Sequence, residues 1–485
     1  MPELTATTAA RVAEATNAGP TAARGSTRDT GSFRDPAGFV FYRDGVVYRQ
    51  IDPSFADEWQ AYLDSGLYDR LVAEGIVLAH EDADPALAAE PPAFRVIRPE
   101  QLELLSYPYE WSFSQLQDAA LVTLRAQAFA AEAGFTLRDA SAYNVQYHRG
   151  RPMLIDSLSF ERAQPDRPWA PYRQFCEHFL APLALMARVD VRLGKLLRSN
   201  LDGIPLDLAA RLLPGRTRLS MGLGPHIHLH ARAQRQHAAD DSAGSSSVTM
   251  SAKRVATLIE SLRDTVTGLS WEAEGTAWAD YADNTSYDDT ATAAKVGAVH
   301  DMLTAIGGER AWDLGANTGR YSRIAADMGY RVVALDADPA AVERGYLALK
   351  NDQRDDVTPL LADITDPSPA LGWGSRERSG LLERIEAGAD VILALALVHH
   401  LAIGANVPLA MIARLFARLA PHAIVEFVPK DDAMVQRLLA SRRDVFSGYS
   451  LDGFKRALEP HFELISEIPI QESTRTLLRL QRRDA

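Results

Sequence analysis

Apolar and polar positions follow two different patterns along the chain, and the change between them divides it into two halves. In residues 38–51, GFVFYRDGVVYRQI, apolar and polar residues alternate on both sides of Asp44 and Gly45, which predicts two strands joined by a tight turn. Residues 114–134 have helical spacing and end at Gly134, a residue that suits the end of a helix. Strands followed by helices predict an α+β fold for this half.

The second half alternates short apolar runs with helical segments, which predicts a doubly wound α/β fold with a parallel sheet. Two further apolar runs at the end of the chain are joined by a turn and predict an antiparallel edge of that sheet. The expected parallel strands are 310–315, 331–336, 357–363, 389–398 and 422–428, and the final two strands are 462–470 and 473–483.

Small polar residues crowd together in residues 236–254, where the apolar periodicity stops. Together with the polar start of the chain, this segment suggests a division into four parts. We expect a disordered lead at 1–35, an α+β domain at 36–237, a linker at 238–252 and an α/β domain at 253–485.

Composition narrows the classes of function. Hydrophobic residues make up 47% of the 485 residues, and no run of 18 apolar residues occurs, so we expect a protein without membrane spans. The single cysteine, Cys176, excludes an internal disulfide and favours the cytoplasm. A net charge of −13 opposes binding to nucleic acid or to an anionic membrane. The sequence does not indicate an oligomeric state. A small-molecule substrate fits this composition best.

The sequence DLGANTG occurs where the first strand of the second half turns into a helix. Gly315 permits a tight turn and close approach of a ligand, and the following helix offers free N–H groups at the carboxyl edge of the sheet. By spacing alone, a dinucleotide site is also compatible with this loop. Asp336 ends the next strand, where it can contact a ligand or, like Asp338, cap the helix that starts at Pro339.

The motifs DLGANTGRYS, VVALDAD, LLADIT and LALALVHHL, in this order, resemble those of class I S-adenosylmethionine-dependent methyltransferases. The resemblance implies that S-adenosylmethionine is the cofactor and that a Rossmann-like sheet holds it. Asp336 would bind the ribose and Asp363 the adenine, while Tyr287 would belong to a flap over the cofactor. The cofactor-binding residues implied are Asp313, Gly315, Asn317, Gly319, Asp336, Asp363 and Tyr287.

His399 and His400 follow the fourth strand, where a base is placed to take a proton from the acceptor. We expect one of the two to be catalytic and the other structural. The signature [DNS]PP[YF] is absent, which speaks against methylation of nucleic-acid bases. Glu426 and Lys430 either line the acceptor pocket or lie in a solvated loop.

The segment from about Phe39 to Leu183 resembles the kinase-like, aminoglycoside-phosphotransferase-like fold, because LRDASAYN is followed by a hairpin that ends at Asp156. In that fold Asp139 would orient a hydroxyl, while Asn144 and Asp156 would bind magnesium and hold Mg-ATP. However, no glycine-rich loop precedes them, and Arg49 takes the place of the nucleotide-binding lysine. The alternatives are a bifunctional kinase and methyltransferase, a pseudokinase scaffold, or ordinary turns at these residues.

The whole chain resembles nodulation-protein-like methyltransferases, through YPYEWSFSQLQDAAL, LRDASAYNVQ, WAPYRQF and VEFVPKDD. This resemblance implies a small-molecule acceptor such as an oligosaccharide or another secondary metabolite. His226, His228 and His230 would share one face if they lay in a strand, but they lack the partners of a firm metal site. The aromatic residues Tyr107, Tyr109, Trp111 and Phe113 are expected in core or inter-domain packing.

Overall fold

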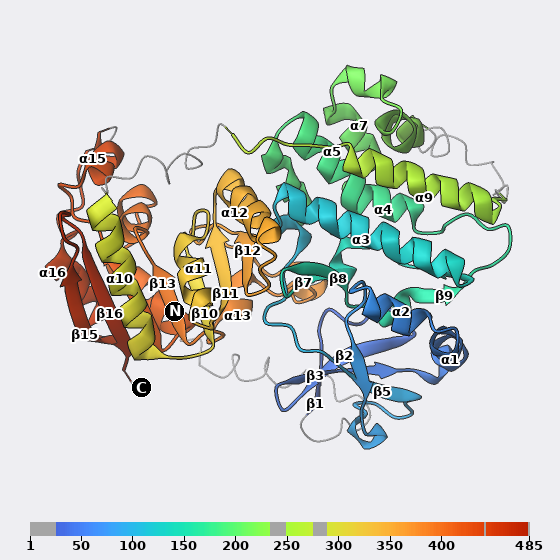
Figure 1. Ribbon diagram of the computed structural model, residues 1–485, viewed down its shortest axis with the longest axis horizontal. Helices are drawn as coiled ribbons and strands as arrows, with labels where there is room; N and C mark the ends of the chain where they lie inside the picture. Colours follow the sequence, from blue (N-terminus) through green and yellow to red (C-terminus); the bar gives the residue numbers. More distant parts are fainter. Residues whose placement is uncertain (1–25, 233–248, 275–288, 441–442, 484–485) are drawn as a thin grey trace, which may run out of the picture.

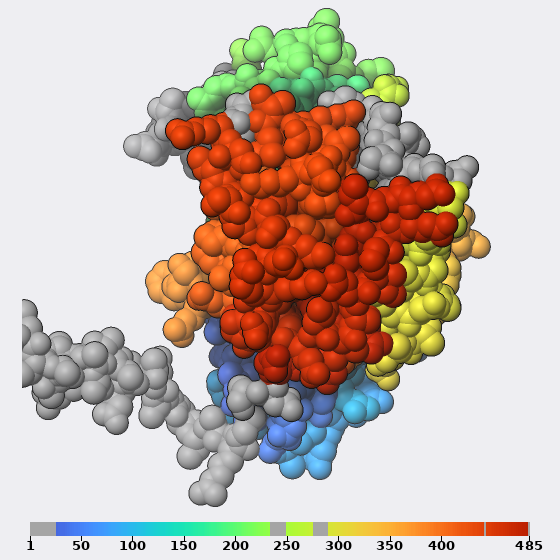
Figure 2. Space-filling model, turned by 90° about the vertical axis from the view of Figure 1, so that its left-hand side faces the viewer, coloured from blue at the N-terminus to red at the C-terminus, as the bar shows by residue number. Residues whose placement is uncertain are grey.

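The computed structural model describes residues 26–232, 249–274, 289–440 and 443–483, and it places two large sheets with their own helices side by side (Figure 1). In the view of Figure 2 the C-terminal part of the chain faces the reader, with the first strands of the chain below it and green helices of the first half above it. We call residues 26–274 the N-terminal half and residues 289–483 the C-terminal half. Among the described residues, no helix combines the length and apolarity needed to cross a bilayer.

A five-stranded antiparallel sheet begins the N-terminal half, in the order β1-β2-β3-β5-β4. Asp44 and Gly45 both have positive φ and join β2 to β3, so the predicted hairpin is confirmed. The strands are β1 (Ser26–Arg28), β2 (Gly38–Arg43), β3 (Val46–Ile51), β4 (His80–Asp82) and β5 (Arg95–Pro99), with helices α1 (Ala56–Asp64) and α2 (Leu67–Ala73) between β3 and β4.

Helix α3 (Phe113–Glu132) begins the helical layer, and the Ser112 side chain accepts a hydrogen bond at its start. Helix α9 (Ala252–Thr267) packs along it, and the Gln117 amide donates to the carbonyls of Val266 and Leu269, both at 2.8 Å. The other elements are β6 (Phe135–Leu137), β7 (Val145–His148), β8 (Arg151–Leu154), β9 (Phe160–Arg162), α4 (Tyr172–Phe175), α5 (Ala181–Arg188), α6 (Leu196–Ser199) and α7 (Leu206–Leu212).

Two segments lie elsewhere than the sequence division places them. The division puts α9 in the second domain, whereas its apolar face packs on α3 of the N-terminal half (Figure 1). Residues 26–35 fall in the expected disordered lead, yet β1 pairs with β2, and the Arg34 guanidinium bonds the Glu377 carboxylate at 2.7 Å. Residues 1–25 lie outside the described residues.

A seven-stranded sheet forms the C-terminal half, in the order β12-β11-β10-β13-β14-β16-β15. The first five strands are parallel and the last two are antiparallel, so the predicted mixed sheet with an antiparallel edge is confirmed. The strands are β10 (Arg310–Leu314), β11 (Arg331–Asp336), β12 (Val357–Leu361), β13 (Val391–Ala394), β14 (His422–Phe427), β15 (Phe462–Pro469) and β16 (Thr476–Arg482).

Helices connect these strands, as the alternating pattern predicts. The order in which successive strands are added to the sheet reverses between β10 and β13, which is where ligands of doubly wound sheets bind. The helices are α10 (Asp289–Ile306), α11 (Arg320–Asp327), α12 (Pro339–Asn351), α13 (Leu381–Ile385), α14 (Leu409–Leu419), α15 (Ala433–Leu439) and α16 (Leu451–Leu458).

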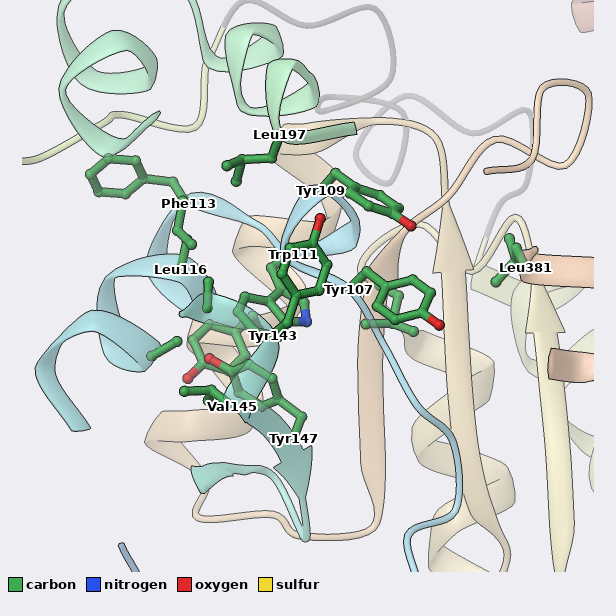
Figure 3. Close-up of a cluster of buried hydrophobic side chains, with 14 of the residues drawn as sticks. Tyr107, Tyr109, Trp111, Phe113, Leu116, Tyr143, Val145, Tyr147, Leu197 and Leu381 are labelled. Carbon is green, nitrogen blue, oxygen red and sulfur yellow. The ribbon is translucent and has the colours of Figure 1, made fainter. Parts of the chain in front are cut away.

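An aromatic cluster lies where the two halves meet, and most of its members come from the N-terminal half (Figure 3). Tyr147 meets the Tyr346 ring of α12 edge to face, with ring centroids 5.9 Å apart. At the start of α3, the Ser114 backbone and hydroxyl both donate to the Glu343 carboxylate of α12, at 3.0 and 2.5 Å. The cluster confirms the expected packing role, and its labelled aromatic members are Tyr107, Tyr109, Trp111, Phe113, Tyr143 and Tyr147.

A buried ion pair joins Glu110 of the N-terminal half to Arg384 of the C-terminal half, with side chains 3% and 5% exposed. The same guanidinium donates to the Leu105 carbonyl, and the Ser368 hydroxyl donates to Glu110 at 2.6 Å. All of these polar groups therefore have partners within a buried contact.

We predict that Arg384→Met lowers the free energy of unfolding by about 3–5 kcal/mol, because it leaves the Glu110 carboxylate buried without its counter-charge. Arg418→Met is the matched control. It breaks the pair with Glu386, whose side chains are 48% and 42% exposed, and should cost under about 1 kcal/mol. Urea unfolding of the full chain measures both. Equal losses of unfolding free energy in the two variants would show that the buried pair stabilises the protein no more than the exposed pair does.

Candidate functional site

The loop between β10 and α11 adopts backbone conformations that its sequence favours. Gly315, Asn317 and Gly319 have φ values of 74°, 52° and 83°, a region that glycine and asparagine enter most readily. The N–H groups of Gly315 and Ala316 both donate to the Leu335 carbonyl, at 2.8 and 3.1 Å. The loop is thereby held against the end of β11, at the carboxyl edge of the sheet.

Asp336 ties this loop to the start of α12. Its two carboxylate oxygens accept the backbone N–H groups of Asn317 at 2.7 Å and Asp338 at 2.8 Å. Burial raises the pKa of Asp336, and the two N–H groups oppose that rise. Each oxygen has further lone pairs, so Asp336 is able to accept two more hydrogen bonds from a ligand.

Asp338, two residues later, is the helix cap. Its carboxylate accepts the N–H groups of Ala340 at 2.8 Å and Ala341 at 3.2 Å, in the first turn of α12. The capping role that the sequence left open between the two aspartates therefore belongs to Asp338, and Asp336 faces the loop.

Asp313 is turned into the protein rather than toward the loop. It is 2% exposed and accepts the Ser322 hydroxyl of α11 at 2.6 Å, and burial raises its pKa to about 6. Because this bond joins β10 to α11, Asp313 fixes the geometry of the turn.

Asp363 follows β12 and reaches the same edge of the sheet. One of its oxygens accepts the Thr365 N–H at 2.8 Å and the Thr365 hydroxyl at 2.6 Å. Asp363 and Ala337 line a cavity of about 30 Å³ that also has walls from the N-terminal half. The structure thus brings the predicted residues Gly315, Asn317, Gly319, Asp336 and Asp363 to one edge, whereas Tyr287 lies outside the described residues.

His399 and His400 are in contact after β13, with ring centroids 4.0 Å apart. His399 is fully buried, and neither of its ring nitrogens has a hydrogen-bond partner among the described residues. Burial, with the neighbouring His400 and Arg475, lowers the pKa of His399 to about 2, and burial with Arg475 lowers the pKa of His400 to about 4. Both rings are neutral at pH 7, and His400 is the stronger base of the two.

A buried charge network lies in the same half and includes residues that sequence reasoning missed. The Lys295 ammonium bonds Glu426 at 2.5 Å, and Arg475 bonds Glu426 at 3.3 Å and Asp432 at 2.7 Å. Lys295 also lies 4.6 Å from the centre of the Tyr321 ring, just after the glycine loop. Glu426 is thus buried rather than solvated.

Lys430 differs from Glu426, although both belong to one short motif that begins in β14 and continues past its end. Its ammonium pairs with Asp444 at 2.7 Å, with about a quarter of the side chain exposed. The solvated-loop interpretation therefore describes Lys430.

The three residues of the kinase-like motif come together in the N-terminal half. Asn144 and Asp156 both bond the Ser159 hydroxyl, at 3.4 and 2.6 Å. Asp139 lies beside them, where burial raises its pKa while hydrogen bonds from Ser141 and Asn144 oppose the rise.

Arg49 of β3 forms an ion pair with Asp156, and both side chains are largely buried. Burial alone would raise the pKa of Asp156, but the Arg49 charge and the Ser159 hydrogen bond lower it below the usual value. Both carboxylate oxygens of Asp156 are therefore bonded, one to the Arg49 guanidinium and the other to the Ser159 hydroxyl.

The three alternating histidines do not lie in a strand. Gly224–Leu229 is a short wide helical turn, in which His226 bonds Tyr172 at 2.7 Å and Ser261 at 3.0 Å. His228 bonds Thr217 at 2.8 Å instead. The interpretation that these histidines lie in a strand was therefore wrong. The described parts of the chain contain no cluster of three or more potential metal-ligating side chains.

No protein-family model matches the chain. Nodulation protein NoeA of Rhizobium meliloti (strain 1021) is 36% identical over 466 residues, which cover 94% of this chain and 96% of that protein. The resemblance to nodulation proteins expected from the sequence is therefore confirmed over nearly the full length of both chains.

Solved structures are similar at a much lower level. The N-methyltransferase NodS from Bradyrhizobium japonicum WM9 is 14% identical with a TM-score of 0.31, over 41% of this chain and 99% of NodS. The bifunctional kinase-methyltransferase WbdD is 16% identical with a TM-score of 0.30, over 44% of each chain. Likenesses at this level carry no argument about function.

We predict that the free energy of unfolding falls as the pH is lowered from 7 to 5. Unfolded histidines take up protons below about pH 6.5, whereas His399 and His400 resist protonation until about pH 2 and 4. The unfolded chain then binds more protons, so stability is present above pH 6.5 and is lost below it. Urea unfolding at pH 7 and pH 5 measures this fall in the free energy of unfolding. The fall should be roughly 1–2 kcal/mol smaller for His399→Asn than for the unaltered chain. An equal loss in both proteins would contradict the assignment.

Proposed function

The chain belongs to the family of nodulation protein NoeA, and we propose that it transfers the methyl group of S-adenosylmethionine to a small-molecule acceptor. The observation that carries the proposal is the position of Asp336. Its carboxylate holds the glycine loop at the switch point of a sheet ordered β12-β11-β10-β13-β14-β16-β15.

The residues at this edge suit the parts of the cofactor. Asp336 has acceptor capacity for two ribose hydroxyls, and Asp363 has a second oxygen for an adenine amino group. Gly315 lets the backbone approach closely, because a Cβ at this positive-φ position would lie 3.2 Å from the Leu397 side chain. When bound, S-adenosylmethionine supplies a methyl group on a sulfonium, and the acceptor takes this methyl group by in-line attack as S-adenosylhomocysteine leaves.

His400 is the better candidate for the base that takes the acceptor proton. It is neutral at pH 7 and keeps a higher pKa than His399, which is fully buried and suits a wall of the site. A hydroxyl or an amine is the nucleophile that such a base serves. An oligosaccharide or another secondary metabolite is the acceptor class that the family resemblance favours.

For the N-terminal half we propose a scaffold related to kinases, without phosphotransfer. The Arg49–Asp156 ion pair supports this assignment, because it neutralises the carboxylate that would bind magnesium. The alternative, a bifunctional kinase and methyltransferase, requires Arg49 to leave a largely buried partner, which is costly.

We expect S-adenosylhomocysteine to raise the melting temperature of the full chain, because a ligand at 100 times its Kd adds about 2.7 kcal/mol of stability. Asp336→Ala should abolish the shift, since it removes the ribose contact. Asp338→Asn keeps a good helix cap and should retain the shift. Absence of a shift with the unaltered chain would overturn the methyltransferase proposal.

Mg-ATP, in contrast, should leave the melting temperature unchanged, because Asp156 already forms an ion pair with Arg49. Thermal unfolding at millimolar Mg-ATP tests this expectation, with Asp156→Ala as the comparison. A shift in the unaltered chain that disappears in Asp156→Ala would instead support a nucleotide site, and turnover of ATP would establish the bifunctional alternative.

A further inference from the structure

The small cavity at Asp363 lies between the two halves of the molecule. On one side are Ala337 and Asp363, which follow β11 and β12. On the other are Tyr109 and two basic residues of the N-terminal half, Lys195 and Arg198. Its volume of about 30 Å³ corresponds to one water molecule, so it accommodates the edge of a ligand and not a whole ring.

Tyr109 is only 5% exposed, and its hydroxyl has no hydrogen-bond partner among the described residues. Buried hydroxyl groups in folded proteins are nearly always satisfied by the protein, by water or by a ligand. Figure 3 shows the Tyr109 hydroxyl directed away from α3, toward the strands of the C-terminal sheet. An unsatisfied donor is therefore present in the wall that faces Asp363.

Neighbouring contacts fix the position of Tyr109. Glu110, the next residue, is held by Arg384 and by the Ser368 hydroxyl of the C-terminal half. The Tyr109 ring also packs on Tyr107, with centroids 5.5 Å apart. Tyr109 thus lines the cavity from a segment that these contacts hold in place.

We propose that the N-terminal half completes the adenine pocket of the methyltransferase, with the Tyr109 hydroxyl donating a hydrogen bond to an adenine ring nitrogen opposite Asp363. The proposal rests on the proposed function, because it needs S-adenosylmethionine at the carboxyl edge of the sheet. The chemistry is complementary: the Asp363 carboxylate accepts from the amino group of adenine, and the tyrosine hydroxyl donates to its unprotonated ring nitrogens. The cofactor site then belongs to both halves.

Tyr109→Phe tests the hydroxyl while keeping the ring in the aromatic cluster. We expect the Kd of the full chain for S-adenosylhomocysteine, measured by calorimetry, to rise by about three- to ten-fold. Without ligand, the melting temperature should stay the same or rise, because the removed hydroxyl has no partner to lose.

Tyr143→Phe is the matched control. Tyr143 belongs to the same cluster, and its buried hydroxyl also has no partner among the described residues, but it does not line the cavity. Its variant should bind S-adenosylhomocysteine as the unaltered chain does. Equal affinities of the Tyr109→Phe variant and the unaltered chain, or equal weakening in both variants, would overturn this inference alone. No binding by the unaltered chain would overturn the proposed function itself.

Discussion

The buried ion pair between Glu110 and Arg384 is a contact that joins the two halves and holds the segment beside the candidate cofactor site. Charges removed from water are tolerated only when their hydrogen-bonding capacity is used, and here Ser368 and the Leu105 carbonyl complete the set. Because Glu110 follows Tyr109 directly, the same pair fixes the wall above the carboxyl ends of β11 and β12. The geometry of the candidate cofactor site is therefore a property of the whole chain.

Asp139, Asn144 and Asp156, whose order in the sequence resembles a kinase-like loop, make contacts inside the N-terminal half. Asp139, Asn144 and Asp156 meet as the motif predicts, yet Arg49 bonds Asp156. An arginine presents a rigid fork of donors that matches a carboxylate, which a lysine does not. Arg49 of β3 thus links the sheet to the segment that follows β8, and the proposed scaffold role of this half rests on that contact.

Local signals in the sequence predicted the helices and strands. Which of these elements pack against one another became known only from the structure. Asp44 and Gly45 specify their hairpin by themselves, and the loop from Gly315 to Gly319 has the residues that positive φ favours. Helix α9 shows in its periodicity only that it has an apolar face, and not that α3 covers this face. Lys295 and Glu426 are 131 residues apart, and no pattern of spacing connects them.

The charge network also bears on the acceptor. Its two cations, Lys295 and Arg475, are balanced by two anions, Glu426 and Asp432, so the network carries no net charge. An anionic acceptor would find no excess positive charge there, and burying its charge without a partner would be costly. A neutral molecule with a hydroxyl or an amine is not subject to that cost. Because Arg475 lies near His400, the base that we propose, this balance of charge supports the proposed acceptor without negative charge.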